Sequence, residues 1–144
     1  MRHGLAPEDL AGLLERPLVA VLATFRPSGG ALLSPVWHEW RDGGFTVWTG
    51  GDDVKVRHLR RDPRASIALF ESELPYRGIE VRGRAEIVSV GVRQAAQRIA
   101  NRYLGPDRAN AYLAESSEGV LIRLGPGELR SWDFADEFGD ARRQ

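Results

Sequence analysis

The alternation of apolar and polar residues along the chain predicts a series of short strands with a few helices between them. Residues 18–25 form a continuous apolar run of the length of a buried strand. Residues 79–90 alternate apolar and polar side chains, which is typical of a strand with one face in water. Residues 91–104 instead carry apolar side chains at helical spacing. We predict helices over 7–16, 52–62, 91–104 and 107–115, and strands over 18–25, 31–40, 45–49, 66–70, 79–90, 120–124 and 129–134.

The connections between the first three predicted strands are short. Residues 26–30 and 41–44 are rich in the glycine, proline and aspartate that supply the dihedral angles of tight turns. Such connections join antiparallel neighbours and argue against a doubly wound parallel sheet. We therefore predict a mostly β fold with α (α+β), a split β-barrel of antiparallel, Greek-key-like topology with short helices packed outside. Gly83, in the middle of the long strand, predicts a bulge or a close approach of another backbone.

Length and composition narrow the class of protein. The 144 residues suffice for one domain with a core, so we expect a single domain over 1–144, its core at about 7–134 and a polar tail at 135–144. The formal net charge is zero, so no global field attracts nucleic acid or an acidic membrane. Cysteine is absent, which removes disulfides and thiol chemistry. The longest apolar run has eight residues and the chain start is acidic, so we expect a cytoplasmic protein without nucleic-acid or membrane partners.

The segment 49–64, T-G-G-D-D-V-K-V-R-H-L-R-R-D-P-R, combines a strand end, two glycines and the start of a basic helix. Free N–H groups at a helix start suit a phosphate when a cation lies nearby, so the segment predicts an anion cradle. Asp52 is the predicted N-cap, and Lys55 falls in the first helical turn. A capped surface helix with a solvated basic face explains the same spacing, and both interpretations stay open. Asp52 and Asp53 compete with a phosphate for the positive end of the helix.

Side chains for conventional catalysis are sparse. In the stretch 34–40, S-P-V-W-H-E-W, His38 and Glu39 lack a second histidine at ligand spacing, so we predict no metal site. We expect His38 on the wet side of a half-exposed strand. No nucleophile with a matching base is visible, which favours a bound organic cofactor that carries the reaction itself. Four tryptophans are suited either to stack on a flat ring system or to fill a core or interface: Trp37, Trp40, Trp48 and Trp132.

Several segments of the chain occur together, in this order, in a known family. They are L-A-T-F-R-P-S-G-G, L-S-P-V-W, the strand ending in T-G, K-V-R-H-L-R-R-D-P-R, and Y-R-G-I-E-V-R-G-R-A-E-I. They resemble the pyridoxamine 5'-phosphate oxidase-like split β-barrel family, in particular its actinobacterial branch of flavin/deazaflavin oxidoreductases that use coenzyme F-420. The resemblance covers residues 10–134, and residues 55–64 are its most specific part.

The resemblance implies a homodimer with two cofactor sites at the dimer interface. The tricyclic ring is expected against residues 33–37 and 48–50, with Lys55 and Arg57 facing the phosphate and further arginines along the anionic tail of F-420. FMN needs only the phosphate end of this groove. Asp53 stands where some relatives carry a basic residue, which weakens the phosphate contact. The implied cofactor-binding residues are Ser34, Pro35, Val36, Trp37, Trp48, Thr49, Gly50, Lys55, Arg57 and Arg61, with Trp132 of the partner subunit over the ring.

The implied activity is hydride transfer from reduced F-420 to an electron-poor small-molecule acceptor. The acceptor classes are an enone, a quinone, a nitroaromatic or a tetrapyrrole. Solvent, His38 or Tyr76 is the expected proton donor. Two alternatives stay open: an FMN-dependent oxidoreductase of the same fold, and a non-catalytic protein that binds and carries the deazaflavin.

Overall fold

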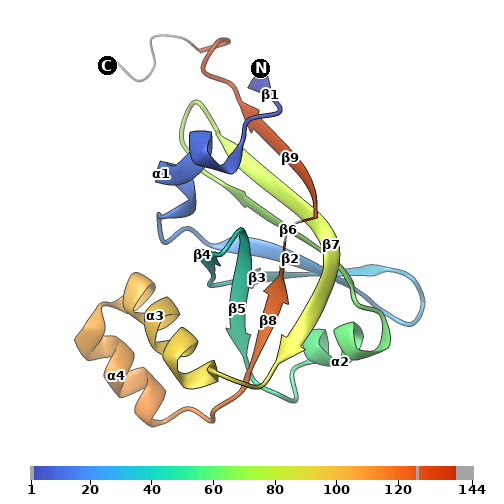
Figure 1. Ribbon diagram of the computed structural model, residues 1–144, viewed down its shortest axis with the longest axis vertical. Coiled ribbons are helices and arrows are strands. Elements are labelled where there is room, and N and C mark those ends of the chain that lie inside the picture. Colours follow the sequence, from blue (N-terminus) through green and yellow to red (C-terminus); the bar gives the residue numbers. More distant parts are fainter. Residues whose placement is uncertain (1, 126, 139–144) are drawn as a thin grey trace.

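The computed structural model describes residues 2–125 and 127–138, and their strands form one strongly curled antiparallel sheet (Figure 1). The strand order is β3-β2-β6-β7-β8-β5-β4, and β9 pairs with both β7 and β1. The strands are β1 (Arg2–His3), β2 (Ala20–Phe25), β3 (Ala31–Val36), β4 (Glu39–Arg41), β5 (Gly44–Thr49), β6 (Arg64–Phe70), β7 (Gly78–Val88), β8 (Val120–Leu124) and β9 (Glu128–Asp133). The helices are η1 (Pro7–Leu10, a 3-10 turn), α1 (Ala11–Leu14), α2 (Val54–Arg61), α3 (Val92–Leu104) and α4 (Pro106–Ala114).

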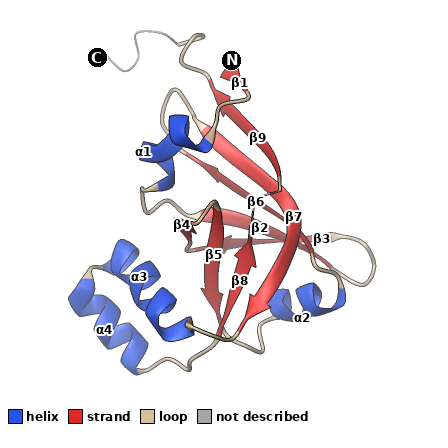
Figure 2. Cartoon of the chain, viewed as in Figure 1, coloured by secondary structure: helices blue, strands red, loops and turns tan. Residues whose placement is uncertain are grey.

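The helices lie on the outside of the curled sheet (Figure 2). Helix α2 packs on β2 and β7, whereas α3 and α4 form a hairpin whose first helix packs on β5 and β8. The antiparallel α+β architecture and the existence of four helical regions confirm the sequence prediction. The first helical region is shorter than predicted, because η1 and α1 end at residue 14.

Strand β7 gives the sheet its curl, because its two halves have different neighbours. Residues 78–82 pair with β9, and residues 85–88 pair with β8. Gly83 lies where the partner changes. Another backbone approaches closely here, as predicted: a Cβ atom built on Gly127 would lie only 2.1 Å from the carbonyl oxygen of Arg82. A side chain at Gly127 would therefore force the two backbones apart.

The predicted strand over 31–40 is wrong in one respect, because it is two strands separated at Trp37 and His38. β3 pairs with β2, and β4 pairs with β5, so the chain crosses from one edge of the sheet to the other at this corner. Strict alternation of faces does not continue through a corner. Val36, His38 and Glu39 are therefore all buried, and the prediction of His38 on a wet face is wrong.

The main core fills the space between the curled sheet, α1 and α2. Its largest fully buried side chains include Leu10 and Leu13 from the N-terminal turns and Phe45 from β5. A smaller cluster between α3 and α4 joins Ala96, Ala100, Ala109 and Leu113, with Trp48 packed against it. No helix in the described ranges is long and apolar enough to cross a membrane, and the cytoplasmic location stays a prediction.

Both ends of the described chain lie at the same end of the molecule (Figure 1). The two-residue strand β1 pairs with β9, a contact that the sequence did not indicate. Beyond β9, the carbonyl of Phe134 accepts a hydrogen bond from the N–H of Glu137 at 2.9 Å, so the start of the predicted polar tail is a turn. The rest of that tail, residues 139–144, lies outside the described residues.

Candidate functional site

Helix α2 begins at Val54, two residues after the start of the predicted range 52–62, and its N-cap is Asp53 rather than Asp52. Asp53 has extended backbone angles, and its carboxylate accepts a hydrogen bond from the N–H of Lys55 at 3.1 Å. This is the geometry of a side chain that caps the first turn, because Asp53 directly precedes the first helical residue, Val54. Asp52 is exposed and lies outside the cap. The helix start is therefore already occupied by a carboxylate.

The same carboxylate holds the side chain of Lys55, the only lysine of the chain. The Lys55 Nζ lies 2.8 Å from Oδ1 of Asp53, and the lysine side chain is 14% exposed. Burial works to raise the pKa of Asp53, but the hydrogen bonds and charge of Lys55, with the charge of Arg57, outweigh it and lower that pKa. Asp53 thus makes the two contacts, to a helix N–H and to an ammonium group, that the sequence assigned to a phosphate.

The arginines of the basic segment divide into two groups. Arg61 donates a hydrogen bond to the carbonyl of Phe25, and Arg64 forms an ion pair with Asp62 at 2.8 Å. The side chains of Arg57 and Arg60 are exposed and form no hydrogen bond or ion pair with another residue in 2–125 and 127–138. These two guanidinium groups therefore remain available to an anion among the described residues.

The buried face of α2 fixes the helix to the sheet. His58 is 7% exposed, and its Nδ1 lies 3.0 Å from the hydroxyl oxygen of Thr24 on β2. Val56 and Leu59 are also buried in the core beneath the helix. These contacts hold the opposite face, with Arg57 and Arg60, toward solvent.

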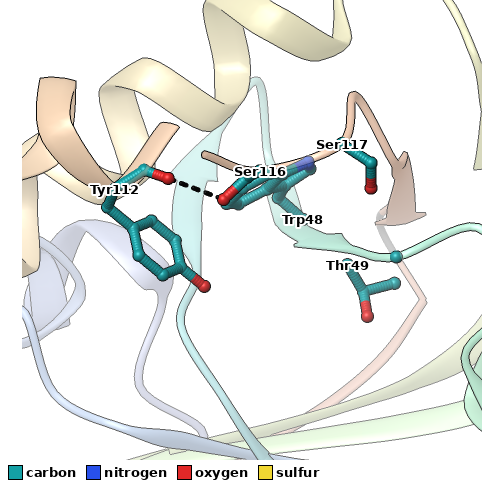
Figure 3. A pocket seen from close by; sticks show the side chains of 6 residues that line it. Trp48, Thr49, Tyr112, Ser116 and Ser117 are labelled. Carbon is teal, nitrogen blue, oxygen red and sulfur yellow. Dashed lines mark hydrogen bonds between the residues drawn. The ribbon is translucent and has the colours of Figure 1, made fainter. Parts of the chain in front are cut away.

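A cavity of about 360 Å³ lies where the end of β5 meets the C-terminal end of α4 (Figure 3). Trp48, Thr49 and Gly50, which the resemblance assigns to cofactor binding, line one side. The other lining residues were not predicted: Tyr112, Ser116 and Ser117. Tyr112 lies on a predicted helix, but helical spacing alone does not indicate which strand that helix meets.

The indole of Trp48 is held in a fixed orientation at this cavity. Its Nε1 donates a hydrogen bond to the carbonyl of Glu118 at 2.8 Å, and its ring meets Tyr112 edge to face at 6.0 Å between centroids. Ser116 in turn donates to the carbonyl of Tyr112 at 2.7 Å. The wall therefore combines two aromatic rings at right angles with the hydroxyl groups of serine, threonine and tyrosine.

Trp37 lies next to this wall but does not line the cavity. Its ring stacks on Tyr103 at 4.8 Å with an interplanar angle of 6°, and it lies 6.1 Å from the ring of Tyr112. One face of Trp37 is thus covered by the helical hairpin. Of the two roles left open for the tryptophans, the structure shows Trp40 in core packing, edge to face with Phe45 at 4.8 Å.

His38 is fully buried beneath the aromatic residues. Its Nδ1 lies 2.9 Å from the hydroxyl of Tyr103, which donates to the carbonyl of Leu18 at 2.7 Å. Its Nε2 has no hydrogen-bond partner among the residues that the structure describes. Burial, helped by the charge of Arg102, lowers the pKa of His38 to about 4. The imidazole is neutral at physiological pH and has no contact with solvent. The structure therefore places it away from the position of a proton donor to an acceptor in the cavity.

The other predicted site residues lie outside the cavity. On β3, Pro35 is exposed, Ser34 is half-buried and Val36 is buried. Tyr76 lies in the β6–β7 loop, where its ring meets that of Phe138 edge to face at 6.4 Å.

Trp132 on β9 lies against Gly78 on β7. A Cβ atom on Gly78 would lie 2.2 Å from Cζ2 of the indole. The guanidinium carbon of Arg130 lies 4.7 Å from the centre of the same ring. Within the protomer, Trp132 is thus held between β7 and a neighbouring cation.

The fold and the position of the cavity can now be compared with known proteins. The sequence model of the pyridoxamine 5'-phosphate oxidase family matches residues 6–133. The chain belongs to this family. Proteins of the family bind flavins, and its members are oxidoreductases. No curated protein matches the chain.

Solved structures of other proteins share this architecture. A conserved hypothetical protein of Mycobacterium tuberculosis is 27% identical with a TM-score of 0.81, over 94% of this chain and 89% of that protein. An F420 reductase is 29% identical with a TM-score of 0.70, over 86% of this chain and 98% of that one. A FAD-binding protein of Mesorhizobium loti is 18% identical with a TM-score of 0.63, over 90% and 93% of the two chains, and supports the fold alone.

Metal binding finds no support in the described ranges. Within 2–125 and 127–138, no group of three or more His, Asp or Glu side chains is placed to hold a metal ion.

Proposed function

We propose that this chain is a cofactor-dependent oxidoreductase that transfers a hydride from reduced coenzyme F-420 to an electron-poor small molecule. One observation carries the proposal. One wall of the cavity is formed by Trp48, Thr49 and Gly50. In the sequence these residues are followed a few positions later by Lys55 and the exposed arginines of α2. A flat ring beside this wall therefore has cations within reach of its phosphate. The family, and the similarity to an F420 reductase, support the same class of activity.

The residues around α2 fit an anionic cofactor in part. A Cβ atom on Gly50 would meet no other atom within 4 Å, so the backbone is open to a ligand at the cavity wall. Lys55 at the start of the helix, and Arg57 and Arg60 on its exposed face, supply three positive charges. Asp53 opposes them, because it already holds Lys55 at 2.8 Å. A phosphate has to displace this carboxylate or bind beside it.

The two exposed arginines favour F-420 over FMN. The charges of Arg57 and Arg60 are free, and they extend beyond the position of a single phosphate at Lys55. F-420 carries further carboxylates on its tail, which such cations bind by charge-assisted hydrogen bonds. FMN ends at its phosphate, so it has no further anionic group for these two arginines to bind.

When bound, reduced F-420 supplies a hydride, that is, two electrons and one proton. The acceptor takes up the hydride and a second proton, which we assign to solvent because His38 is buried and Tyr76 lies elsewhere. The chain itself binds and orients the reactants. Trp48 and Tyr112 provide rigid flat surfaces, and the hydroxyl groups of the wall fix polar atoms of the acceptor.

We also propose that the functional unit is a homodimer in which a second copy completes the site. Cross-strand partners on the outer face of β3, β2 and β6 include the rows Pro35–Val21–Ala68 and Leu33–Ala23–Ser66, which carry no charge. Leu33 is 64% exposed and Phe70, at the end of β6, is 46% exposed. An uncharged sheet face of this kind is suited to pairing with its own copy. In the dimer, Trp132 of the partner subunit is the proposed cover of the ring.

The test is the spectrum and cofactor affinity of the purified protein. F-420 titrated into colourless protein is expected to change its fluorescence at micromolar concentration, and reduced F-420 is then oxidised when an acceptor from the proposed classes is added. Yellow protein with tightly bound flavin supports FMN instead. Binding of F-420 without reduction of any acceptor in a broad panel supports the carrier alternative, and absence of F-420 binding contradicts the proposal.

A further inference from the structure

The lining of the cavity beside Trp48 carries hydroxyl groups but no charged side chain. Its polar side chains are those of Thr49, Tyr112, Ser116 and Ser117. Hydroxyl groups donate hydrogen bonds to carbonyl, quinone or nitro oxygens without requiring a charge on the ligand. A ligand that brought a carboxylate into this lining would lose its hydration and gain no cation in return.

The exposed residues next to the lining residues in the sequence carry charge of one sign. Glu115 and Glu118 directly flank the two lining serines, and both are exposed. Neither forms an ion pair with a cation in 2–125 and 127–138. On the opposite wall, Gly50 is followed two residues later by Asp52, whose side chain is exposed. Like charges at the mouth of a site repel an anionic ligand, and salt screens that repulsion.

The cations near the cavity do not offset these carboxylates. Lys55 is neutralised by Asp53 at 2.8 Å. Arg57 and Arg60 lie on the exposed face of α2, beyond the glycine turn that ends the cavity wall. The site therefore has two parts of different charge: a basic side at α2 and a neutral to acidic side at the end of α4.

From this division we propose that the α4 side of the cavity binds flat, uncharged acceptors that carry a hydrogen-bond-accepting oxygen, and discriminates against acceptors with a carboxylate or sulfonate. This rests on the proposed function and narrows its acceptor classes. Uncharged quinones, enones and nitroaromatics fit, whereas a tetrapyrrole with propionate groups does not. The right-angled pair of Trp48 and Tyr112 supplies a face and an edge for a flat ring.

The experiment compares two ligands of similar size that differ in charge. Menadione and naphthoquinone sulfonate are titrated into the full-length, cofactor-free protein, and quenching of tryptophan fluorescence is measured. At low salt, menadione is expected to bind about five- to tenfold more tightly than naphthoquinone sulfonate, because about two nearby carboxylates repel the sulfonate through water. This difference in affinity is expected to shrink at high salt, since salt screens the repulsion. Trp48→Phe identifies the quenched indole, and the quenching is expected to be lost in this variant.

Two sets of variants separate charge from shape. Glu115→Gln combined with Glu118→Gln is expected to bind naphthoquinone sulfonate about five- to tenfold more tightly than the unaltered protein, with menadione binding unchanged. Both residues are exposed, so the double variant keeps the fold. Tyr112→Ala is expected to weaken the binding of both ligands. The matched control is Glu86→Gln, an exposed carboxylate on β7 that lies outside the cavity, and it is expected to change neither affinity.

The outcomes are distinct from those of the F-420 titration, because this binding is measured without cofactor. Equal affinity for the two ligands, or quenching that persists in Trp48→Phe, overturns the inference even if F-420 binds. An unchanged sulfonate affinity in the double glutamine variant overturns it as well. If F-420 does not bind but menadione still binds more tightly than naphthoquinone sulfonate, the proposed cofactor is wrong and the proposed acceptor site is supported.

Discussion

At the scale of single residues, Asp53 and Lys55 decide how an anion meets α2. Asp53 caps the helix and holds the ammonium group of Lys55, so it occupies the place of a phosphate oxygen. The sequence already showed that an aspartate near this helix start competes with a phosphate. The structure shows that Asp53, and not Asp52, caps the helix and contacts Lys55 directly.

Asp53→Asn is expected to strengthen the binding of F-420 or FMN by about 1 kcal/mol, because it removes one repelling charge and frees Lys55. Asparagine also caps helices well, so α2 is expected to keep its stability. The affinity is measured by fluorescence titration. Asp52→Asn is the matched control, since Asp52 is exposed and lies outside the cap. An affinity that falls in Asp53→Asn, or rises equally in both variants, contradicts the assignment.

The buried imidazole of His38 is expected to make stability depend on pH. Burial and Arg102 lower its pKa from 6.5 to about 4, so between these values the unfolded chain binds a proton that the folded protein does not. The free energy of unfolding therefore falls as pH is lowered from 6.5 toward 4, by at most about 3 kcal/mol from this residue. Urea unfolding across this range measures the slope. In His38→Gln this part of the pH dependence is expected to disappear, and an unchanged slope refutes the assignment.

At the scale of elements, the close packing of β9 on β7 depends on glycine at position 78, which has no side chain to collide with Trp132. Gly78→Ala would place a Cβ atom 2.2 Å from the ring of Trp132. We expect this substitution to lower the free energy of unfolding by about 1–3 kcal/mol, the range for overpacking. Gly12→Ala in α1 meets no atom within 4 Å and is expected to be neutral or stabilising by up to about 1 kcal/mol. Chemical denaturation of both variants measures the difference, and equal effects contradict the packing argument.

The elements also show what the sequence could predict. Local signals located the strands over residues 20–25 and 44–49 and the helices α2 and α3 within a few residues, because periodicity and turn residues act locally. The corner at Trp37 and His38 was missed, since it depends on which strands the chain joins. Tyr112, Ser116 and Ser117 were missed for the same reason: α4 meets the end of β5 only through tertiary packing. The predicted residues of β5 lie at the cavity, whereas those of β3 do not line it.

At the scale of the whole molecule, the mostly uncharged outer face of β3, β2 and β6 is the proposed contact between two copies of the chain. Leu33→Asp places a charge in the middle of this face and is expected to convert the dimer into a monomer, because burying an unpaired carboxylate is costly. Light scattering after size-exclusion chromatography measures the mass. Val90→Asp is the matched control: Val90 is 83% exposed, precedes α3 and lies outside this face, so the dimer is expected to persist. A monomeric unaltered protein contradicts the proposal.

The central claim is that Lys55 binds the phosphate of a cofactor whose ring lies beside Trp48. Its most direct test is the affinity of Lys55→Ala for F-420, measured by fluorescence titration against Arg93→Ala, which removes an exposed cation on α3. We expect Lys55→Ala to lose about 1–3 kcal/mol of binding free energy, roughly a five- to 150-fold weaker affinity, and Arg93→Ala to bind like the unaltered protein. Equal affinity of Lys55→Ala and Arg93→Ala would contradict the account.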